Sequence, residues 1–567
     1  MATEVSKFSV YDPRIVQTQP KYAVEKGAQS ITNVNVKSQT ADLSSVQFNV
    51  QVPSENVFID RAVRWSATQV ASITLTADVS GGGNIPAGTD LSGLLGPAAF
   101  PLHQSVSQMS ATINDATVTV NTKDVLPQIL RLADLADSRR QRTCPTMLDR
   151  YAQYPDSRVV PNTPLATWAE TTSSDEVPNS GFLGWAYCTA VGALVDNDVV
   201  GDVTYVRGVP TLTANAGDGD TVTFYVRWTS TELLVLPPFL FAAERELSTG
   251  LFGVQNFQVQ MNMAPNPSRS LRASTRTTLA SSVAGEFGTF SAGAPAWVSP
   301  GAYGMFLTQP VLQVQFLTPS LSLPLPPKSI VPWMEYPRYI TSQAGLVPVT
   351  NILDPALTPL HSQTITLPNI PDLIMIYAKK QTYSVTDCDF VLPVSKISIN
   401  FDNFSGLLAN HSQEELYKMS VDNGVDMDFS EWSGQGRVPL SVANGAGVTK
   451  IGGVLGLCGG PLVLRPGRDF ALQEGQAAGL VGNFTLQFDL SVKNASSAAV
   501  NPDIYVVPIS SGFFETIKGS SRIIKGVLTE QDILGAPAQA PSADLQRPVG
   551  AGMRGGKHGP SGMSGYM

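Results

Sequence analysis

The side chains that most often perform acid–base, nucleophilic or metal chemistry are few in this chain and far apart. Its 567 residues include four cysteines without CxxC spacing and only four histidines: His103, His361, His411 and His558. A zinc site needs His or Cys ligands at short, fixed spacings, and a catalytic triad needs a base that an acid orients beside a nucleophile. Because His103 and His361 both follow a Pro-Leu pair in turn-like sequences, we predict loop histidines rather than catalytic ones.

The acidic residues offer two candidate groupings. Asp387 and Asp389 flank Cys388, and paired carboxylates can divide the roles of general acid and general base. No second partner is visible for them, so we predict a solvated edge. The other grouping carries the oxygen ligands that a hard cation prefers: Asp196, Asn197, Asp198 and Asp202. It lacks the EF-hand spacing and its terminal Glu. We therefore predict no metal, no cofactor and no catalytic residue, hence a protein that is not an enzyme.

The densest basic run, Arg139, Arg140 and Arg142, allows two interpretations. A helix is predicted to start with Asp124 as its cap, to hold Pro127 in its first turn and to end at this run. The arginines are then either a solvated helix end or an inward patch that contacts packaged nucleic acid, since Arg binds phosphate well. The net charge of −9 argues against a surface that coats nucleic acid generally.

The elements that would position these residues are predicted to be strands. With 48 Gly and 41 Pro but only 15% charged residues, the composition favours sandwiches or barrels over helical bundles. Apolar and polar residues alternate, as in half-buried strands, at 46–52, 222–228, 257–263, 312–316, 397–401 and 484–492. The 567 residues exceed the roughly 250–300 that one core accommodates, so we expect two or more domains.

Nothing in the sequence indicates secretion or a membrane span. No charged segment followed by an apolar one opens the chain, so Cys144, Cys188, Cys388 and Cys458 are predicted to be free thiols. The region 287–327 carries no charge, but its seven prolines exclude a spanning helix.

Two of the alternating segments resemble each other. SVQFNVQVP at 45–53 and NFQVQMNMAP at 256–265 share apolar positions separated by Gln or Asn, and both reach a proline. The similarity is either chance or the mark of two barrels that open with equivalent strands. On the second interpretation, with a crossing at Leu236–Phe239, we expect four parts: an N-terminal arm at 1–24, a first barrel at 25–240, a second at 241–534 and a low-complexity tail at 535–567.

The stretch Leu367–Gly424 combines several of these signals. An apolar run at 373–376 reads as a strand covered on both faces, and the alternation at 397–401 as a half-buried one. Ser412 and Glu415 have the spacing of a capping box, so a helix should begin there and end at Gly424.

This stretch carries a family resemblance. FxLPxSKISINFDNFSGLL at 390–408 and SQEELYKMSxxNG at 412–424 resemble the second half of double-jelly-roll major capsid proteins of polinton-like viruses and virophages. The likeness is weaker at 250–263 and 100–132. It implies an all-β fold of two consecutive jelly-roll barrels, a double jelly roll, with short helices in long loops.

The resemblance also implies a function and partners. It implies a viral major capsid protein of the virion shell, forming pseudo-hexameric homotrimeric capsomers that tile an icosahedral capsid around a DNA genome. The expected partners are further copies of the chain, penton and minor capsid proteins, and packaged DNA through weak contact. From the residues alone, the alternative is a carbohydrate-binding or adhesive β-sandwich protein.

Overall fold

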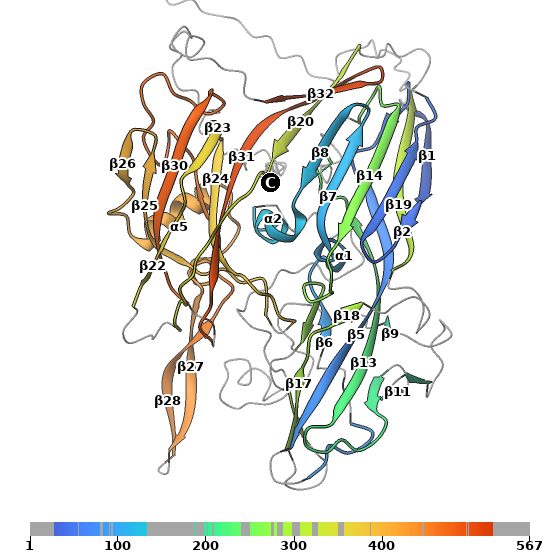
Figure 1. Ribbon diagram of the computed structural model, residues 1–567, viewed down its shortest axis with the longest axis vertical. Coiled ribbons are helices and arrows are strands. Elements are labelled where there is room, and N and C mark those ends of the chain that lie inside the picture. Colours follow the sequence, from blue (N-terminus) through green and yellow to red (C-terminus); the bar gives the residue numbers. More distant parts are fainter. Residues whose placement is uncertain are drawn as a thin grey trace, which may run out of the picture.

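The computed structural model describes residues 28–525 apart from 55, 80–82, 90, 92–94, 133–185, 188–197, 201, 207–208, 240–249, 274–276, 281–286, 298–306, 320–326, 350–355, 386, 445–446, 495 and 497. The described part is mostly β-strand and forms two bodies that lie side by side (Figure 1). The expected arm at 1–24 and tail at 535–567 lie outside the described residues.

The first body is a jelly roll of two antiparallel sheets, with the strand orders β1-β19-β5-β13 and β3-β14-β7-β8. The strands are β1 (Ala28–Lys37), β3 (Ser45–Gln51), β5 (Arg64–Val79), β7 (Val106–Ile113), β8 (Ala116–Val120), β13 (Thr221–Leu233), β14 (Asn256–Met263) and β19 (Leu307–Pro319). In chain order, strands one, eight, three and six form one sheet and strands two, seven, four and five the other, which is jelly-roll connectivity.

The second body repeats this connectivity, with the orders β20-β31-β24-β29 and β22-β30-β25-β26. The strands are β20 (Ser329–Glu335), β21 (Tyr339–Ser342), β22 (Thr358–His361), β23 (Ile365–Asn369), β24 (Leu373–Lys380), β25 (Val394–Phe401), β26 (Phe404–Leu407), β29 (Leu462–Leu464), β30 (Val481–Val492) and β31 (Pro502–Ile517). Here β21 continues β20 along β31, and β23 continues β22 along β30. The predicted double jelly roll is confirmed.

Shorter strands extend or decorate the two jelly rolls. They are β2 (Thr40–Ala41), β4 (Phe58–Ile59), β6 (Leu95–Pro97), β9 (Ala186–Tyr187), β10 (Asp198–Val200), β11 (Val203–Val206), β12 (Val209–Leu212), β15 (Leu271–Ala273), β16 (Thr277–Ala280), β17 (Phe287–Ala292), β18 (Ala296–Trp297), β27 (Gln435–Asn444), β28 (Gly447–Gly456) and β32 (Ser520–Lys525). The β27–β28 hairpin projects from the second jelly roll (Figure 1).

The predicted boundary at 240/241 is wrong. β14 pairs directly with β3, aligning Phe257 with Val50 and Val259 with Phe48, and β19 pairs with β1 and β5. The first jelly roll therefore continues to Pro319. The two similar segments are not equivalent strands of two barrels. They are neighbours in one sheet, with their apolar sides on one core and their Gln and Asn residues on the same outer face.

Each jelly roll also contributes side chains to the core of the other. Val331, Trp333 and Phe514 of the second pack in the core of the first, and Val125 and Ile129 of the first pack in the core of the second. This exchange makes the two jelly rolls one packed block.

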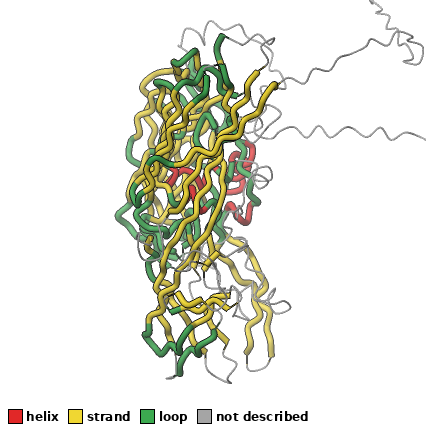
Figure 2. Tube along the Cα trace, turned by 90° about the vertical axis from the view of Figure 1, so that its right-hand side faces the viewer, coloured by secondary structure: helices red, strands yellow, loops and turns green. Residues whose placement is uncertain are grey.

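The described helices are α1 (Pro101–Gln104), α2 (Thr122–Ile129), α5 (Gln413–Asp422) and α6 (Phe429–Trp432), and they lie near mid-height of the long axis (Figure 2). The predicted capping box is confirmed: the Glu415 amide donates to Ser412 Oγ at 3.3 Å, and the Ser412 amide donates to Glu415 Oε2 at 2.9 Å. Within the described residues, no helix is long and apolar enough to cross a membrane.

The start of α2 differs from the prediction. Asn121, not Asp124, is the N-cap residue, and Pro127 lies in the second half of the helix. The carboxylate of Asp124 is instead engaged by Arg338 of the second jelly roll. The helix also ends earlier than predicted, at Ile129 with Leu130 as its C-cap residue. Residues from 133 on, including Arg139, Arg140 and Arg142, lie outside the described residues.

Candidate functional site

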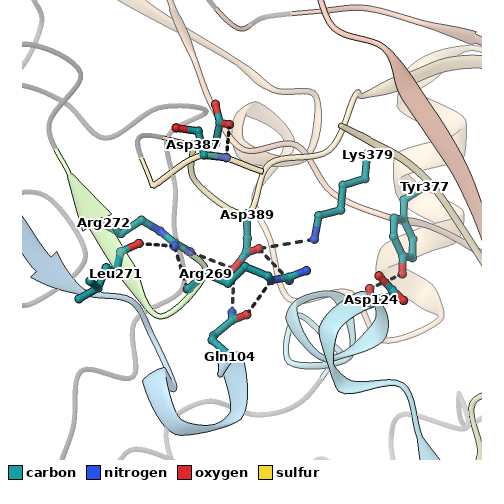
Figure 3. A network of polar contacts seen from close by, with 10 residues as sticks. Gln104, Asp124, Arg269, Leu271, Arg272, Tyr377, Lys379, Asp387 and Asp389 are labelled. Carbon is teal, nitrogen blue, oxygen red and sulfur yellow. Dashed lines mark hydrogen bonds and ion pairs between the residues drawn. The ribbon is translucent and has the colours of Figure 1, made fainter. Parts of the chain in front are cut away.

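A buried polar network centred on Asp389 joins the two jelly rolls (Figure 3). Asp389 belongs to the loop between β24 and β25 of the second jelly roll. Its Oδ1 lies 3.2 Å from Arg269 Nη2 and its Oδ2 lies 3.1 Å from Arg272 Nη2. Gln104 Nε2 donates to Oδ2 at 2.8 Å. These three partners come from α1 and the region of β15 in the first jelly roll, so the network crosses the junction.

A further cation enters the network from the second jelly roll. Lys379 Nζ, on β24, lies 3.6 Å from Asp389 Oδ1. Arg269, Arg272 and Lys379 also approach the ring of Tyr383, at 5.3, 5.6 and 5.7 Å from its centroid. Three cations thus share one carboxylate and one aromatic ring, and cation–π contact compensates part of their lost hydration.

The network shifts the pKa values of its members in the same direction for different reasons. Burial lowers the pKa of Lys379 to about 7, and the repulsion of Arg269 adds to this, against the attraction of Asp389. Burial alone would raise the pKa of Asp389, but the charges of Arg269, Lys379 and Arg272 outweigh it and hold that pKa well below its usual value. Asp389 is therefore the anion on which the junction depends.

Local hydrogen bonds hold the network's donors in place. Arg272 Nη1 donates to the carbonyls of Arg269 and Leu271, at 3.0 and 2.9 Å, which folds the guanidinium back against its own turn. Arg269 Nε donates to Gln104 Oε1 at 3.3 Å. Gln104 thereby accepts from one member of the network and donates to another, so its amide orientation is fixed.

Helix α1 is itself fixed by a buried acid. Glu232, on β13, accepts the amides of Leu102 and His103 at 2.9 and 3.0 Å, and it pairs with His103 Nδ1. The Val235 amide donates to His103 Nε2 at 3.2 Å, so Nδ1 is the nitrogen that carries the proton toward Glu232. His103 and Glu232 are both fully buried. Their geometry positions α1, and with it Gln104, rather than offering a base to a substrate.

Helix α2 makes a second set of contacts across the junction. Tyr377 Oη donates to the Asp124 carbonyl at 2.6 Å. At the end of α2, Arg131 Nη2 lies 3.1 Å from Cys458 Sγ and Nη1 lies 3.4 Å from Glu431 Oε1. The first jelly roll is therefore attached to the second through both α1 and α2.

Several predictions about candidate residues are corrected. Asp387 and Asp389 were expected at a solvated edge, but both are buried, as is Cys388 between them. The reason is that Lys380 pairs with Asp387 at 2.7 Å while Asp389 is neutralised by cations from the other jelly roll. His103 is a buried helix residue, not a loop residue.

Other candidate residues lie at the surface or outside the described part. His361 ends β22, exposed, and its Nδ1 lies 2.7 Å from Asp489 Oδ1 on β30. Of the acidic candidates, Asp196 and Asn197 lie outside the described residues, whereas Asp202 accepts the Thr223 amide at 2.8 Å. No group of three His, Cys, Asp or Glu side chains within the described residues is placed to hold a metal ion. Cys388 and Cys458 are free thiols, and the other two cysteines lie outside the described part.

Two jelly rolls locked into one block by exchanged core residues and a buried polar network define a structural building unit of the double-jelly-roll class. A family model described as the Sputnik virophage major capsid protein 1st domain matches residues 3–317, and one described as the major capsid protein V20 C-terminal domain matches residues 336–512. The chain belongs to this family of virophage major capsid proteins. It is a viral major capsid protein, a component of the virion's capsid shell.

Individual relatives agree with this assignment. The putative capsid protein V20 of Sputnik virophage is 24% identical over 553 residues, covering 94% of this chain and 82% of the relative. The cryo-EM structure of Sputnik virophage matches with a TM-score of 0.69 at 23% identity, over 96% of this chain and 98% of that one. The crystal structure of the mavirus major capsid protein matches with a TM-score of 0.60 at 16% identity, over 95% and 100%. Membership of this family argues against the alternative interpretation, a carbohydrate-binding or adhesive β-sandwich protein.

Proposed function

We propose that three copies of this chain form a homotrimeric capsomer of pseudo-hexameric outline, and that these capsomers tile an icosahedral shell around a DNA genome. The observation that carries the proposal is the repeated strand order of the two jelly rolls within one packed block. Three such chains around a threefold axis supply six similar bodies. A closed threefold arrangement also leaves no growing edge.

The outer face of the β3-β14-β7-β8 sheet supports a lateral contact between copies. The outward side chains are uncharged amides and hydroxyls: Gln47, Asn49, Gln51, Gln108, Ser110, Thr112, Thr117, Thr119, Asn256, Gln258, Gln260 and Asn262. The pairing register aligns them in rows, for example Asn49, Gln258 and Thr112. Burying uncharged groups avoids the desolvation cost of charges. It also limits repulsion between copies that each carry −9.

Added negative charge on this face tests the lateral contact. Gln258→Glu with Gln260→Glu keeps the side-chain shape and leaves the inward residues of β14 untouched. We expect the trimer to dissociate to folded monomer. Light scattering measures the loss of the trimer, and an unchanged melting temperature of the monomer shows that the fold is intact. Gln487→Glu is the control, because the equivalent face at β30 already carries Asp489. Trimers that persist in the double variant would contradict a contact at this face.

We further propose that the protein acts by assembly and not by catalysis. Its other expected partners are penton and minor capsid proteins, with only weak contact to packaged DNA, which the acidic net charge supports. We also propose a revised division of the chain, in which the first jelly roll ends at Pro319 and the second begins at Ser329. Limited proteolysis that releases a folded fragment starting near residue 240 would contradict this division.

A further inference from the structure

Part of the second jelly roll forms a bridge over one end of the first. The bridge consists of β20, the later half of β31, and β32, which pair side by side. Its inner face places Val331, Trp333 and Phe514 in the core of the first jelly roll. At the tip of the β7–β8 hairpin, the Ser521 amide donates to Asp115 Oδ1 at 2.5 Å. This inner face is thus fully used within the chain.

The outer face of the bridge exposes apolar side chains on both sides of one charged row, in which Glu515 is aligned with Arg522. The pairing aligns Pro332, Phe513 and Ile524 in one row across the three strands. Phe513 is 53% exposed. Ile330, aligned with Glu515 in the next row, is 44% exposed, and Ile517, one row further along, is 41% exposed. We call these five residues the bridge patch. Single exposed apolar residues are ordinary, but an aromatic side chain among apolar neighbours on one sheet face is typical of a contact surface.

The charged residues of the same strands give the bridge patch a cationic rim. Lys328 and Arg522 both pair with Glu515, at 3.4 and 2.9 Å, but Glu515 itself is buried beneath them. Lys525 is not part of this rim: it pairs with Glu335 at 2.6 Å, and its Nζ lies 5.6 Å from the ring of Trp333, on the inner side of the bridge. The two carboxylates that reach the bridge from neighbouring elements, Asp115 and Asp372, lie at its ends and accept the amides of Ser521 and Ser511. A complementary ligand would therefore combine apolar side chains with carboxylates.

The chain carries such a segment immediately after the bridge. Residues 527–534 read VLTEQDIL, with an apolar pair at each end, two carboxylates between them and no cation. β32 ends at Lys525, directly after Ile524 of the bridge patch, so a tether of one residue holds this segment next to the patch, at high effective concentration. The first 27 residues fit less well, since they hold four Lys and Arg against three Asp and Glu.

We propose that residues 527–534 dock on the bridge patch, with Phe513 as the central apolar contact and Glu530 and Asp532 facing the cationic rim. The segment is that of the same chain, which the one-residue tether after Lys525 favours, so the proposal does not rest on the proposed trimer. Docking would cover the apolar patch and fasten the end of the second jelly roll over the first.

Photo-crosslinking in the full-length protein tests the proposal. A benzophenone amino acid replaces Phe513 in one variant and Val481 in the control, because Val481 is a 60% exposed apolar residue on β30. Trypsin cuts after Lys525 and Arg554 but not after Arg547, which precedes Pro548, so the docked segment lies in one peptide that mass spectrometry identifies. We expect the adducts from position 513 to fall mainly within 527–534, at a yield at least fivefold above that from position 481. In the Glu530→Gln, Asp532→Asn background, we expect the yield to fall several-fold.

The other outcomes are equally defined. Adducts from position 513 that fall mainly outside 527–534, or a yield no higher than the control, would overturn the proposal. Mixing isotope-labelled and unlabelled protein before assembly tests the source, because only docking between copies gives mixed adducts; mainly mixed adducts would therefore overturn docking within one chain. Light scattering on the same samples reports the oligomeric state independently, so a failure of trimer formation and a failure of docking are distinguishable.

Discussion

Replacing Asp389 by Asn probes the junction because the amide keeps the shape of the carboxylate but removes its charge. The side chains of Arg269 and Arg272 are only 6% and 0% exposed, so water cannot replace the lost anion. Breaking a buried ion pair by removing one partner typically costs about 3–5 kcal/mol. Lys379 can release its proton and so relieve part of the repulsion. We therefore expect the free energy of unfolding to fall by about 3–5 kcal/mol in total, rather than by this amount for each of Arg269 and Arg272.

Denaturant unfolding of the purified full-length protein, followed by tryptophan fluorescence, measures this loss. Asp489→Asn is the matched control: its carboxylate is 50% exposed and pairs with His361, and exposed pairs contribute only about 0–1 kcal/mol. Because the cations keep the pKa of Asp389 below its unfolded value of 3.8, its stabilisation should be present above pH 3.8 and be lost as the pH falls toward the folded pKa. Equal losses in both variants would refute the role of the network.

Three further substitutions test other parts of the account. Lys379→Met should raise the free energy of unfolding by on the order of 1–3 kcal/mol at pH 7 and below. The gain should shrink as the pH rises from about 7 to 10.5. Over that window Lys379 is neutral in the folded protein but still protonated in the unfolded chain, so the original protein becomes more stable as the pH rises. Unfolding curves recorded across this pH range check the prediction. Ser412→Ala should cost about 1 kcal/mol, while Ser412→Asp, which can still cap α5, should cost less in the same assay. Gly460→Ala should cost about 1–3 kcal/mol, because a Cβ there would overlap the buried ring of Trp432, whereas Gly345→Ala, with open space around its Cβ, should be close to neutral in thermal unfolding.

Alternation located the strands well but did not identify their neighbours. In β3 and β14 the apolar side chains face one core, as the sequence predicts. The similarity of the segments 45–53 and 256–265 does not come from equivalent positions in two barrels. The two strands are adjacent in one sheet, so both need apolar side chains toward the same core and polar side chains on the same outer face. The family resemblance supplied the fold class, whereas the boundary depended on pairings between strands about 200 residues apart, which the sequence does not display.

The junction was not predictable for a related reason. The partners of Asp389 in the first jelly roll lie 117 to 285 positions away in the chain. In the sequence, Arg269 and Arg272 stand in a turn-like segment after two prolines, where solvated arginines are the ordinary interpretation. The one local signal was the position of Asp387 and Asp389 beside an apolar segment, Phe390–Val394, which is buried. The capping box of α5 was predictable because every contact lies within four residues.

The mass and symmetry of the purified assembly test the central claim most directly. Light scattering combined with class averages from electron microscopy should give three times the mass of the 567-residue chain, a threefold axis and a six-cornered outline. Under assembly conditions the same material should form closed shells. A stable monomer at micromolar concentration, with neither trimers nor shells at any salt concentration, would contradict the proposed capsomer.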